Sequence, residues 1–292
     1  MAETARSLTT GRLTIQRWRR GKGGGRIADE LAVEEPLEIR LETRSIAVTM
    51  RTPGNDEELA AGFLLSESAI RNADDLAVIR PNRRNKDGNS IDVFLRPGLT
   101  ATMDDLTRHV FASSSCGLCG RTSIESLSAR IKKISSGLKV SPGLLLALPP
   151  RMREAQETFS RTGGLHGAGL FSENGELLIL REDVGRHNAV DKVIGWALLQ
   201  KLLPLNRHIL LISGRASFEI VQKSLIAGIP LVAAVSAPST LAVALARRYR
   251  QTLVGFLRDS SLNVYSQPKR LIRPRNTKRG KHLAARPVSS TL

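Results

Sequence analysis

The second half of the chain alternates short apolar runs with longer helical patterns, and this rhythm restricts the fold more than any other feature. The runs HILLIS, IPLVAAVS and TLVGFLR are short and almost entirely apolar, which is typical of buried strands. Between them lie GRASFEIVQKSLIAG and APSTLAVALARRY, which read as helices. Strand and helix in turn predict parallel strands joined by right-handed crossovers, so the expected fold class is α/β.

Composition and length agree with this layering. The chain has 292 residues, of which 41% are hydrophobic and only 4% aromatic, so aliphatic side chains must fill the core. Before the alternating region, residues 33–50 predict two strands with a turn near Glu42–Arg44. A helix follows in NDEELAAGFLLSE, and a DG turn and a strand follow in KDGNSIDVFLR. We expect a smaller α+β subdomain over residues 27–107 and a main domain over residues 108–267.

The formal charge of +17 is concentrated at the two ends of the chain. Residues 1–26 hold seven Lys and Arg against one Glu, a net of +6, and residues 268–292 hold eight with no acid, a net of +8. Subtracting both from +17 leaves +3 for residues 27–267. Such segments are typical of disordered basic arms, with a clamp on nucleic acid or a partner as the alternative. No nucleic-acid-binding motif lies between them, so nucleic acid is not an expected partner.

No membrane segment or secretory signal is expected. The most apolar stretch, SLIAGIPLVAAV, is short and contains Gly228 and Pro230, and the N-terminus has no charged start followed by an apolar run. Two cysteines in a chain of this length do not make a disulfide framework. We expect a cytoplasmic protein with reduced thiols.

The strand ends are where ligands collect in open α/β sheets, because helix N-termini present free N–H groups there. A hairpin, GGLHGAGLF to ELLILR, precedes the alternating region. The residues at the predicted strand ends are Arg181, Asp183, Ser213, Gly214, Arg215, Ser236 and Arg258. Their arginines, glycines and serines suit a phosphorylated ligand, with ordinary surface and capping residues as the alternative.

The only two cysteines, Cys116 and Cys119, form a C-x-x-C pair in ASSSCGLCGRTSIESL. Thr122 and Glu125 make a T-x-x-E capping box, so a helix is expected to begin directly after the pair. The helix N-terminus and the adjacent arginine favour thiolate over thiol. The loop is a candidate for reactive sulfur, with two ordinary surface thiols as the alternative.

Zinc and redox chemistry are other uses of such a pair. A structural zinc ion takes four ligands, and the further candidates are His109, His166 and His187. The zinc deaminase signature pairs H-x-E with P-C-x-x-C, but Ser115 precedes the first cysteine and no H-x-E occurs. A lone C-x-x-C is also weak support for thioredoxin-like activity.

A second constellation lies in REDVGRHNAVDKVIG, at a predicted helix start. It gathers Glu182, Asp183, Arg186, His187, Asp191 and Lys192. These groups can perform acid/base work, bind a polar ligand or form a salt-bridged helix cap, and the spacing does not decide between these roles. His166 is flanked by glycines, which allow a ligand to approach the backbone closely.

Five motifs together resemble the formate dehydrogenase accessory sulfurtransferase family. They are SSCGLCG, TGGLHGAGLF, REDVGRHNAVDKVIGWAL, SGRASFEIVQKSLIAGIPLVAAVSAPSTLAVALA and LVGFLRDSSLNVYS. They occur in order within residues 34–266, everything except the basic ends. The resemblance implies a homodimer whose main domain has a cytidine-deaminase-like fold.

The resemblance also implies a sulfurtransferase that acts through a cysteine persulfide. Such a protein takes sulfur from a cysteine desulfurase and delivers it to the molybdenum of the bis(molybdopterin guanine dinucleotide) cofactor, before that cofactor enters formate dehydrogenase. The cofactor is cargo, and no metal of the protein's own is expected. By this resemblance Cys116 bears the persulfide and Cys119 is its companion.

The implied cofactor contact is the segment after the last predicted strand. It comprises Phe256, Leu257, Arg258, Asp259, Ser260 and Ser261. This chain departs from the family's pattern there, because Asp259 and two serines replace a segment rich in glycine and arginine, although Arg258 remains. His187 and Arg258 are our candidates to contact a guanine nucleotide. A non-catalytic chaperone for the same cofactor is the alternative function.

Overall fold

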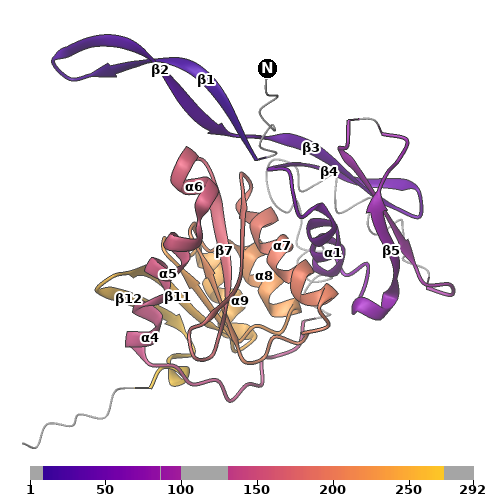
Figure 1. Cartoon of the computed structure of the whole chain (residues 1–292). Helices are drawn as coiled ribbons and strands as arrows, with labels where there is room; N and C mark the ends of the chain where they lie inside the picture. The colour runs from indigo at the N-terminus through magenta and orange to yellow at the C-terminus, as the bar shows by residue number, and fades with distance from the viewer. Residues whose placement is uncertain (1–8, 86, 100–130, 273–292) are drawn as a thin grey trace, which may run out of the picture.

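The computed structural model describes residues 9–85, 87–99 and 131–272, without the side chain of Lys22 (Figure 1). The strands are β1 (Thr10–Arg19), β2 (Lys22–Ala32), β3 (Glu35–Leu41), β4 (Arg44–Arg51), β5 (Leu76–Pro81), β6 (Ser90–Leu95), β7 (His166–Ser172), β8 (Leu177–Asp183), β9 (His208–Ile212), β10 (Leu231–Ala234), β11 (Thr252–Arg258) and β12 (Ser261–Ser266). The helices are α1 (Asp56–Ser66), α4 (Pro142–Leu146), α5 (Leu148–Ala155), α6 (Glu157–Thr162), α7 (Arg186–Leu199), α8 (Phe218–Ile226) and α9 (Thr240–Arg248), with 3₁₀ turns η1 (Ala73–Asp75) and η2 (Pro268–Arg270).

A six-stranded sheet in the order β12-β11-β10-β9-β7-β8 forms the main unit. β9, β10 and β11 are parallel, and helices α8 and α9 connect them, which confirms the α/β prediction. The flanking strands are different: β7 runs antiparallel to β9 and β8, and β12 runs antiparallel to β11. The sheet is therefore mixed, with its parallel part at the centre.

Alternation along the central strands divides the interior into two cores. Leu210 and Ile212 of β9 belong to the core under α7, α8 and α9, whereas Ile209 and Leu211 belong to the core under α4 and α5. Successive side chains of a strand point to opposite faces, so a wholly apolar strand must have helices on both. Figure 1 shows these two helical layers on either side of the sheet.

The N-terminal unit is a four-stranded sheet, β4-β3-β6-β5, covered on one face by α1. β3 and β4 form the expected hairpin, and its turn residues Glu42 and Thr43 both have positive φ. Apolar residues of β3, β6 and α1 belong to the same core cluster as those of α7 and α8. The two units thus share one hydrophobic core rather than meeting at a polar interface.

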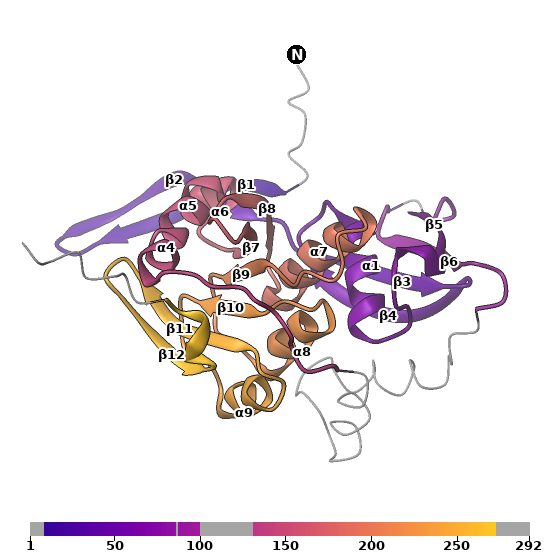
Figure 2. The same ribbon diagram turned by 90° about the horizontal axis from the view of Figure 1, so that it is seen from below.

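Helices α1 and α7 lie side by side (Figure 2). Two glycines, Gly62 and Gly195, make their closest contact. A Cβ on Gly62 would lie 1.9 Å from the carbonyl oxygen of Asp191, and a Cβ on Gly195 would lie 1.8 Å from that of Glu58. Only glycine allows the two backbones to approach this closely. The pair fixes how the N-terminal unit sits on the main unit.

The predicted disorder at the two ends is wrong for part of each. Residues 10–26 belong to the antiparallel β1–β2 hairpin, because Leu13 and Ile15 alternate with polar residues and pair with the second strand. Residues 268–272 pack on the body: Arg270 is buried and Leu271 forms a bridge with Val140. Residues 1–8 and 273–292 lie outside the described part, as does the expected boundary near residue 107. No helix within the described ranges has the length and apolar character that a membrane crossing requires.

We predict that Gly195→Ala lowers the free energy of unfolding by about 3 kcal/mol or more, because neither backbone can move away from the added methyl group. Urea denaturation of the full chain measures this. Gly143→Ala in α4 is the matched control: its Cβ would come no nearer than 4.0 Å to Ser141 Oγ, so its effect should stay within about 1 kcal/mol. Equal stability of the two variants would show that the helices are free to separate.

Candidate functional site

One edge of the six-stranded sheet collects the chain segments that the sequence singled out. The parallel strands β9, β10 and β11 all end there. Because β7 runs the opposite way, its first residue, His166, lies at this same edge, opposite Asp183, the last residue of β8. The amide of Gly167 donates to Ser213 Oγ (2.8 Å), which ties the start of β7 to the end of β9.

Three helices begin at this edge, directly after β8, β9 and β10. Ser217 and Ser239 are the N-cap residues of α8 and α9, and their hydroxyl oxygens accept from the amides of Ile220 (3.5 Å) and Ala242 (3.2 Å). Gly185 is the N-cap of α7 and has no capping side chain. Unsatisfied N–H groups and aligned peptide dipoles make such helix starts favourable for anions. Ser217 and Ser239 each follow an apolar strand and precede a helical pattern, so they are a helix-start signal that is visible in the sequence.

Basic side chains line the same edge. Arg186 and His187 are the first two residues of α7, and Arg215 is exposed in the loop before α8. Within the described residues, the buried Nε of Arg186 has no hydrogen-bond partner. His166 and Arg186 both lie beside Gly214, because a Cβ on this glycine would be 3.3 Å from His166 Nδ1 and 3.9 Å from Arg186 Cδ. The edge is therefore equipped for an anionic ligand.

Burial, followed by the nearby Arg186 and His187, lowers the pKa of His166 below its ordinary value. The folded protein thus binds this proton less readily than the unfolded chain. His166 accordingly costs stability as the pH falls below the unfolded value of 6.5, and the cost stops growing once the pH is below the folded pKa. An anion bound beside the ring would raise the pKa again, so anion binding and proton uptake are coupled.

His187 is held by two groups of α8. Its Nε2 lies 3.0 Å from Ser217 Oγ and 3.0 Å from Glu219 Oε2. Because one nitrogen makes both contacts, the three residues are not a Ser–His–acid relay, which needs one ring nitrogen for each partner. The hydrogen bond from His187 lowers the pKa of Glu219, so this carboxylate stays ionised within the cationic edge.

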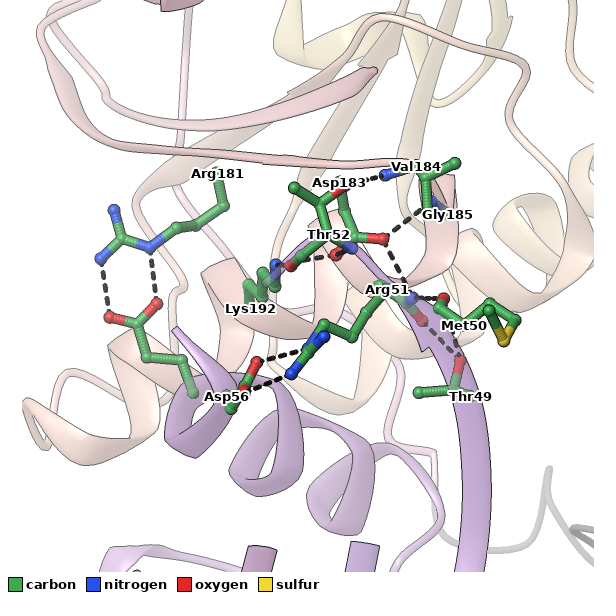
Figure 3. A network of polar contacts seen from close by, with 12 residues as sticks. Thr49, Met50, Arg51, Thr52, Asp56, Arg181, Asp183, Val184, Gly185 and Lys192 are labelled. Carbon is green, nitrogen blue, oxygen red and sulfur yellow. Dashed lines mark hydrogen bonds and ion pairs between the residues drawn. The ribbon is translucent and has the colours of Figure 1, made fainter. Parts of the chain in front are cut away.

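Asp183 and Lys192 of the REDVGRHNAVDKVIG constellation have a structural role (Figure 3). Asp183 is fully buried, and its Oδ2 lies 2.7 Å from Lys192 Nζ. The same oxygen accepts from the amide of Thr52 (3.2 Å), while Lys192 donates to the carbonyl oxygen of Thr52 (2.9 Å). The Oδ1 of Asp183 accepts from Gly185 (2.7 Å) and Asn188 (3.0 Å). A buried ion pair thus locks the end of β4 against the start of α7.

Two arginines extend this lock. The predicted strand-end residue Arg181 forms a bidentate pair with Glu58 of α1 (2.5 and 2.6 Å), so it is not placed to bind a ligand. Arg51 is buried and donates to both carboxylate oxygens of Asp56 (3.0 Å each) (Figure 3). Bidentate arginine–carboxylate pairs fix orientation as well as distance.

A second buried pair lies deeper between the helices. Lys223 Nζ is 2.8 Å from both carboxylate oxygens of Asp191, which also accepts from Ser66 of α1 (2.9 Å). Burial opposes the charge on Lys223, but Asp191 and neighbouring carboxylates raise the pKa of this amine overall. Asp191 and Lys192, like Asp183, therefore join the two units and are not ligand groups.

The predicted cofactor segment lies at the next strand end along the edge. The amide of Phe256 donates to the carbonyl oxygen of Ser236 (3.1 Å), and Phe256 has a positive φ of 51° at a register shift between β11 and β12. The side chain of Leu257 is buried in the core and so cannot reach a ligand. Arg258, whose guanidinium lies 5.8 Å from the Phe256 ring, and residues 259–261 are exposed.

Close packing holds this segment beside the end of β10. A Cβ on Gly255 would lie 2.8 Å from Pro238 and 3.0 Å from the Tyr265 ring. Ala216 and Pro238 form a bridge between the loops after β9 and β10. His187 and Arg258, the two predicted nucleotide contacts, therefore lie on different strand ends of one continuous edge.

Cys116, Cys119 and His109 lie outside the described residues, as does the helix expected after the cysteine pair. In residues 9–85, 87–99 and 131–272, no three His, Cys, Asp or Glu side chains are grouped to hold a metal ion.

Together these features define a class: an α/β protein with a cationic, helix-terminated edge suited to an anionic ligand. A family model described as the FdhD/NarQ family matches residues 32–272. The chain belongs to the FdhD/NarQ family, which confirms the resemblance drawn from the motifs.

Relatives cover most of the chain. It is 51% identical over 251 residues to the sulfur carrier protein FdhD of Streptomyces avermitilis, covering 83% of this chain and 89% of that protein. It is 50% identical over 250 residues to the sulfur carrier protein FdhD of Mycolicibacterium paratuberculosis, covering 83% of this chain and 92% of that protein. A crystal structure of a candidate formate dehydrogenase accessory protein from Desulfotalea psychrophila superposes with a TM-score of 0.73 at 27% identity, covering 90% of this chain and all of that one.

We predict that Lys192→Met lowers the free energy of unfolding by about 3–5 kcal/mol, because it leaves the Asp183 carboxylate buried without its cation. Lys201→Met is the matched control: its pair with Asp74 (2.9 Å) is largely exposed, so this variant should lose far less stability than Lys192→Met. Chemical denaturation of both full-length variants provides the comparison. Similar losses would mean that the buried pair contributes no more than a surface pair.

Proposed function

We propose that the protein is a sulfur carrier and sulfurtransferase that acts through a persulfide on Cys116. It takes sulfur from a cysteine desulfurase and passes it to the molybdenum of the bis(molybdopterin guanine dinucleotide) cofactor, its cargo, before the cofactor enters formate dehydrogenase. The relatives named sulfur carrier protein support the sulfur chemistry. The observation that carries the cargo assignment is the edge where three helix starts converge with Arg186, His187 and His166.

The first step is an exchange between sulfur atoms. The Cys116 thiolate attacks the terminal sulfur of the desulfurase persulfide, a new S–S bond forms at Cys116, and the desulfurase cysteine leaves as a thiolate. No net oxidation occurs. Cys119, three positions along, can then receive or release this sulfur by the same exchange. Delivery to molybdenum as sulfide takes two electrons, which we assign to a thiol reductant.

The edge would hold the cargo by its pyrophosphate groups. Arg186 and the starts of α7, α8 and α9 offer donors and positive potential, which diphosphates prefer. The exposed Arg258, with residues 259–261, would contact the nucleotide from the next strand end. Asp259 stands where the family's pattern has positive charge. Arg186 and the starts of α7, α8 and α9 would therefore supply most of the affinity for phosphate.

The remaining assignments follow from the same proposal. We assign a homodimer in the cytoplasm, with a cysteine desulfurase and a formate dehydrogenase as partners, and a cytidine-deaminase-like arrangement of the main unit. The crystal structure described as a candidate formate dehydrogenase accessory protein supports the link to formate dehydrogenase.

We predict that incubation of the native protein with a cysteine desulfurase and cysteine adds one sulfur atom to Cys116, because its thiolate is the proposed nucleophile. Mass spectrometry of the intact protein and of its peptides locates the adduct. Cys116→Ser should lose both the adduct and the ability to activate formate dehydrogenase in cells, whereas Cys119→Ser should still accept sulfur. Full activation by Cys116→Ser would instead favour a cofactor chaperone without sulfur chemistry.

We predict that guanosine diphosphate, a fragment of the cargo, raises the Tm of the full chain by mass action and does so more than adenosine diphosphate. The bound diphosphate should raise the lowered pKa of His166. The ratio of the wild-type affinity for guanosine diphosphate to the affinity of His166→Gln should therefore rise as the pH is lowered from about 8 to about 6. Calorimetric titration of both proteins removes the ligand's own titration from the comparison. The same pH profile in wild type and variant would exclude His166 from the site.

A further inference from the structure

The β1–β2 hairpin stands away from the rest of the molecule (Figure 1). Among the described residues, the base of the hairpin is attached to the body: Glu30 accepts from Arg161 of α6 and from Thr10 Oγ1 (2.6 Å), and a Cβ on Gly164 would lie 3.6 Å from Ala32. Gly164 precedes His166 by two residues. The hairpin therefore begins beside the edge that we assign to the cargo.

One face of the hairpin carries Leu13, Ile15, Ile27 and Leu31, and no other described part of the chain forms a layer over it. Register pairs Ile15 with Ile27, Leu13 with Asp29 and Leu31 with Gly11, and directly opposed residues share a face. Leu13 is 58% exposed and Leu31 is 41% exposed. A two-stranded hairpin is marginal in water unless its apolar face is covered. The exposed apolar side chains of the hairpin are therefore suited to contact with a partner molecule that would bury them.

The hairpin is also strongly basic. Residues 10–32 contain six Lys and Arg and two acids, a net of +4. The acids are already engaged, since Asp29 lies 3.8 Å from Arg17 and Glu30 pairs with Arg161. The exposed cations that remain, together with Trp18 at 70% exposure, crowd the outer part. Tryptophan and arginine are the residue types that contribute most at protein interfaces.

The charge and the apolar face together select the occupant. In the homodimer that we assign, contact between the two hairpins would bring together two segments of net charge +4, which repel each other. Nucleic acid would satisfy the cations but would leave the apolar face in water. An acidic protein surface with an apolar centre matches both features.

We infer that the β1–β2 hairpin is the docking arm for the protein that accepts the loaded cofactor, an apo-formate dehydrogenase with an acidic surface. The inference rests on the proposed function, because it places the acceptor beside the cargo edge. The hairpin lies almost wholly before the segment that the family model matches, residues 32–272, so it is argued from this chain alone.

The test uses the full-length protein and purified apo-formate dehydrogenase of the same organism, made without molybdenum. Biolayer interferometry at low and at physiological salt measures the Kd. One variant carries R19S, R20S and R26S, and a second carries L13S and L31S. The matched control carries R71S, R83S and R84S, which removes three exposed cations from the N-terminal unit.

We expect the Kd to rise about tenfold or more in the charge variant and to rise also in the apolar variant, with the control close to wild type. Added salt should weaken the wild type more than the charge variant. An unchanged Tm shows that the body remains folded, because the hairpin's outer part does not belong to either core.

Other outcomes overturn the inference. The inference is wrong if the wild type does not bind apo-formate dehydrogenase, or if both hairpin variants bind it as tightly as the wild type does. It is also wrong if the hairpin variants lose only their binding to the desulfurase, only their self-association in sedimentation experiments, or only their binding to DNA. Failure of the proposed function is distinguishable, since it would appear as a wild type that neither accepts sulfur nor shifts its Tm with guanosine diphosphate.

Discussion

The contact of α1 with α7 through two glycines is the constraint on which the rest of the structure depends. Because Gly62 and Gly195 let the helix backbones touch, the end of β4 reaches the start of α7. There the carboxylate of Asp183 meets both Lys192 and the backbone of Thr52. A side chain at either glycine would separate these groups, and a buried ion pair is strongly destabilising when one partner is withdrawn.

The same lock decides which charges are available to a ligand. The segment from Asp183 to Lys192 contains both charged side chains that are buried and basic side chains that lie at the sheet edge. Asp183, Asp191 and Lys192 are buried in ion pairs, whereas Arg186 and His187 lie in the first turn of the helix beside two other helix starts. Because the lock holds the start of α7 rigidly, Arg186 and His187 are already in place before an anion arrives, which lowers the free-energy cost of binding.

Much of this could be predicted from the sequence, and the exceptions have physical reasons. Periodic patterns in the sequence predicted β3, β4, α1 and the region from β7 to β11, because local alternation or helical spacing of apolar residues determines each of these elements. The β1–β2 hairpin was missed, since the glycines at 23–25 conceal the second strand, and α5 was missed because prolines stand at its start. The structural role of Asp183 was beyond local patterns, because its partner Thr52 is 131 residues away in the chain.

A carrier has to release what it binds, and the charge balance of the edge suits that requirement. Glu219 stays ionised beside His187 and within reach of the field of Arg186, so it offsets part of the positive charge that an anionic cargo would meet. The helix starts add only partial charges, about half a unit each. Burial and the nearby Arg186 and His187 lower the pKa of His166, and an anion bound beside the ring would raise it again. Arg186 and the helix starts attract an anion before it binds, whereas the proton on His166 is favoured by the bound anion. This moderate charge, part of which depends on the ligand, favours transfer over permanent retention.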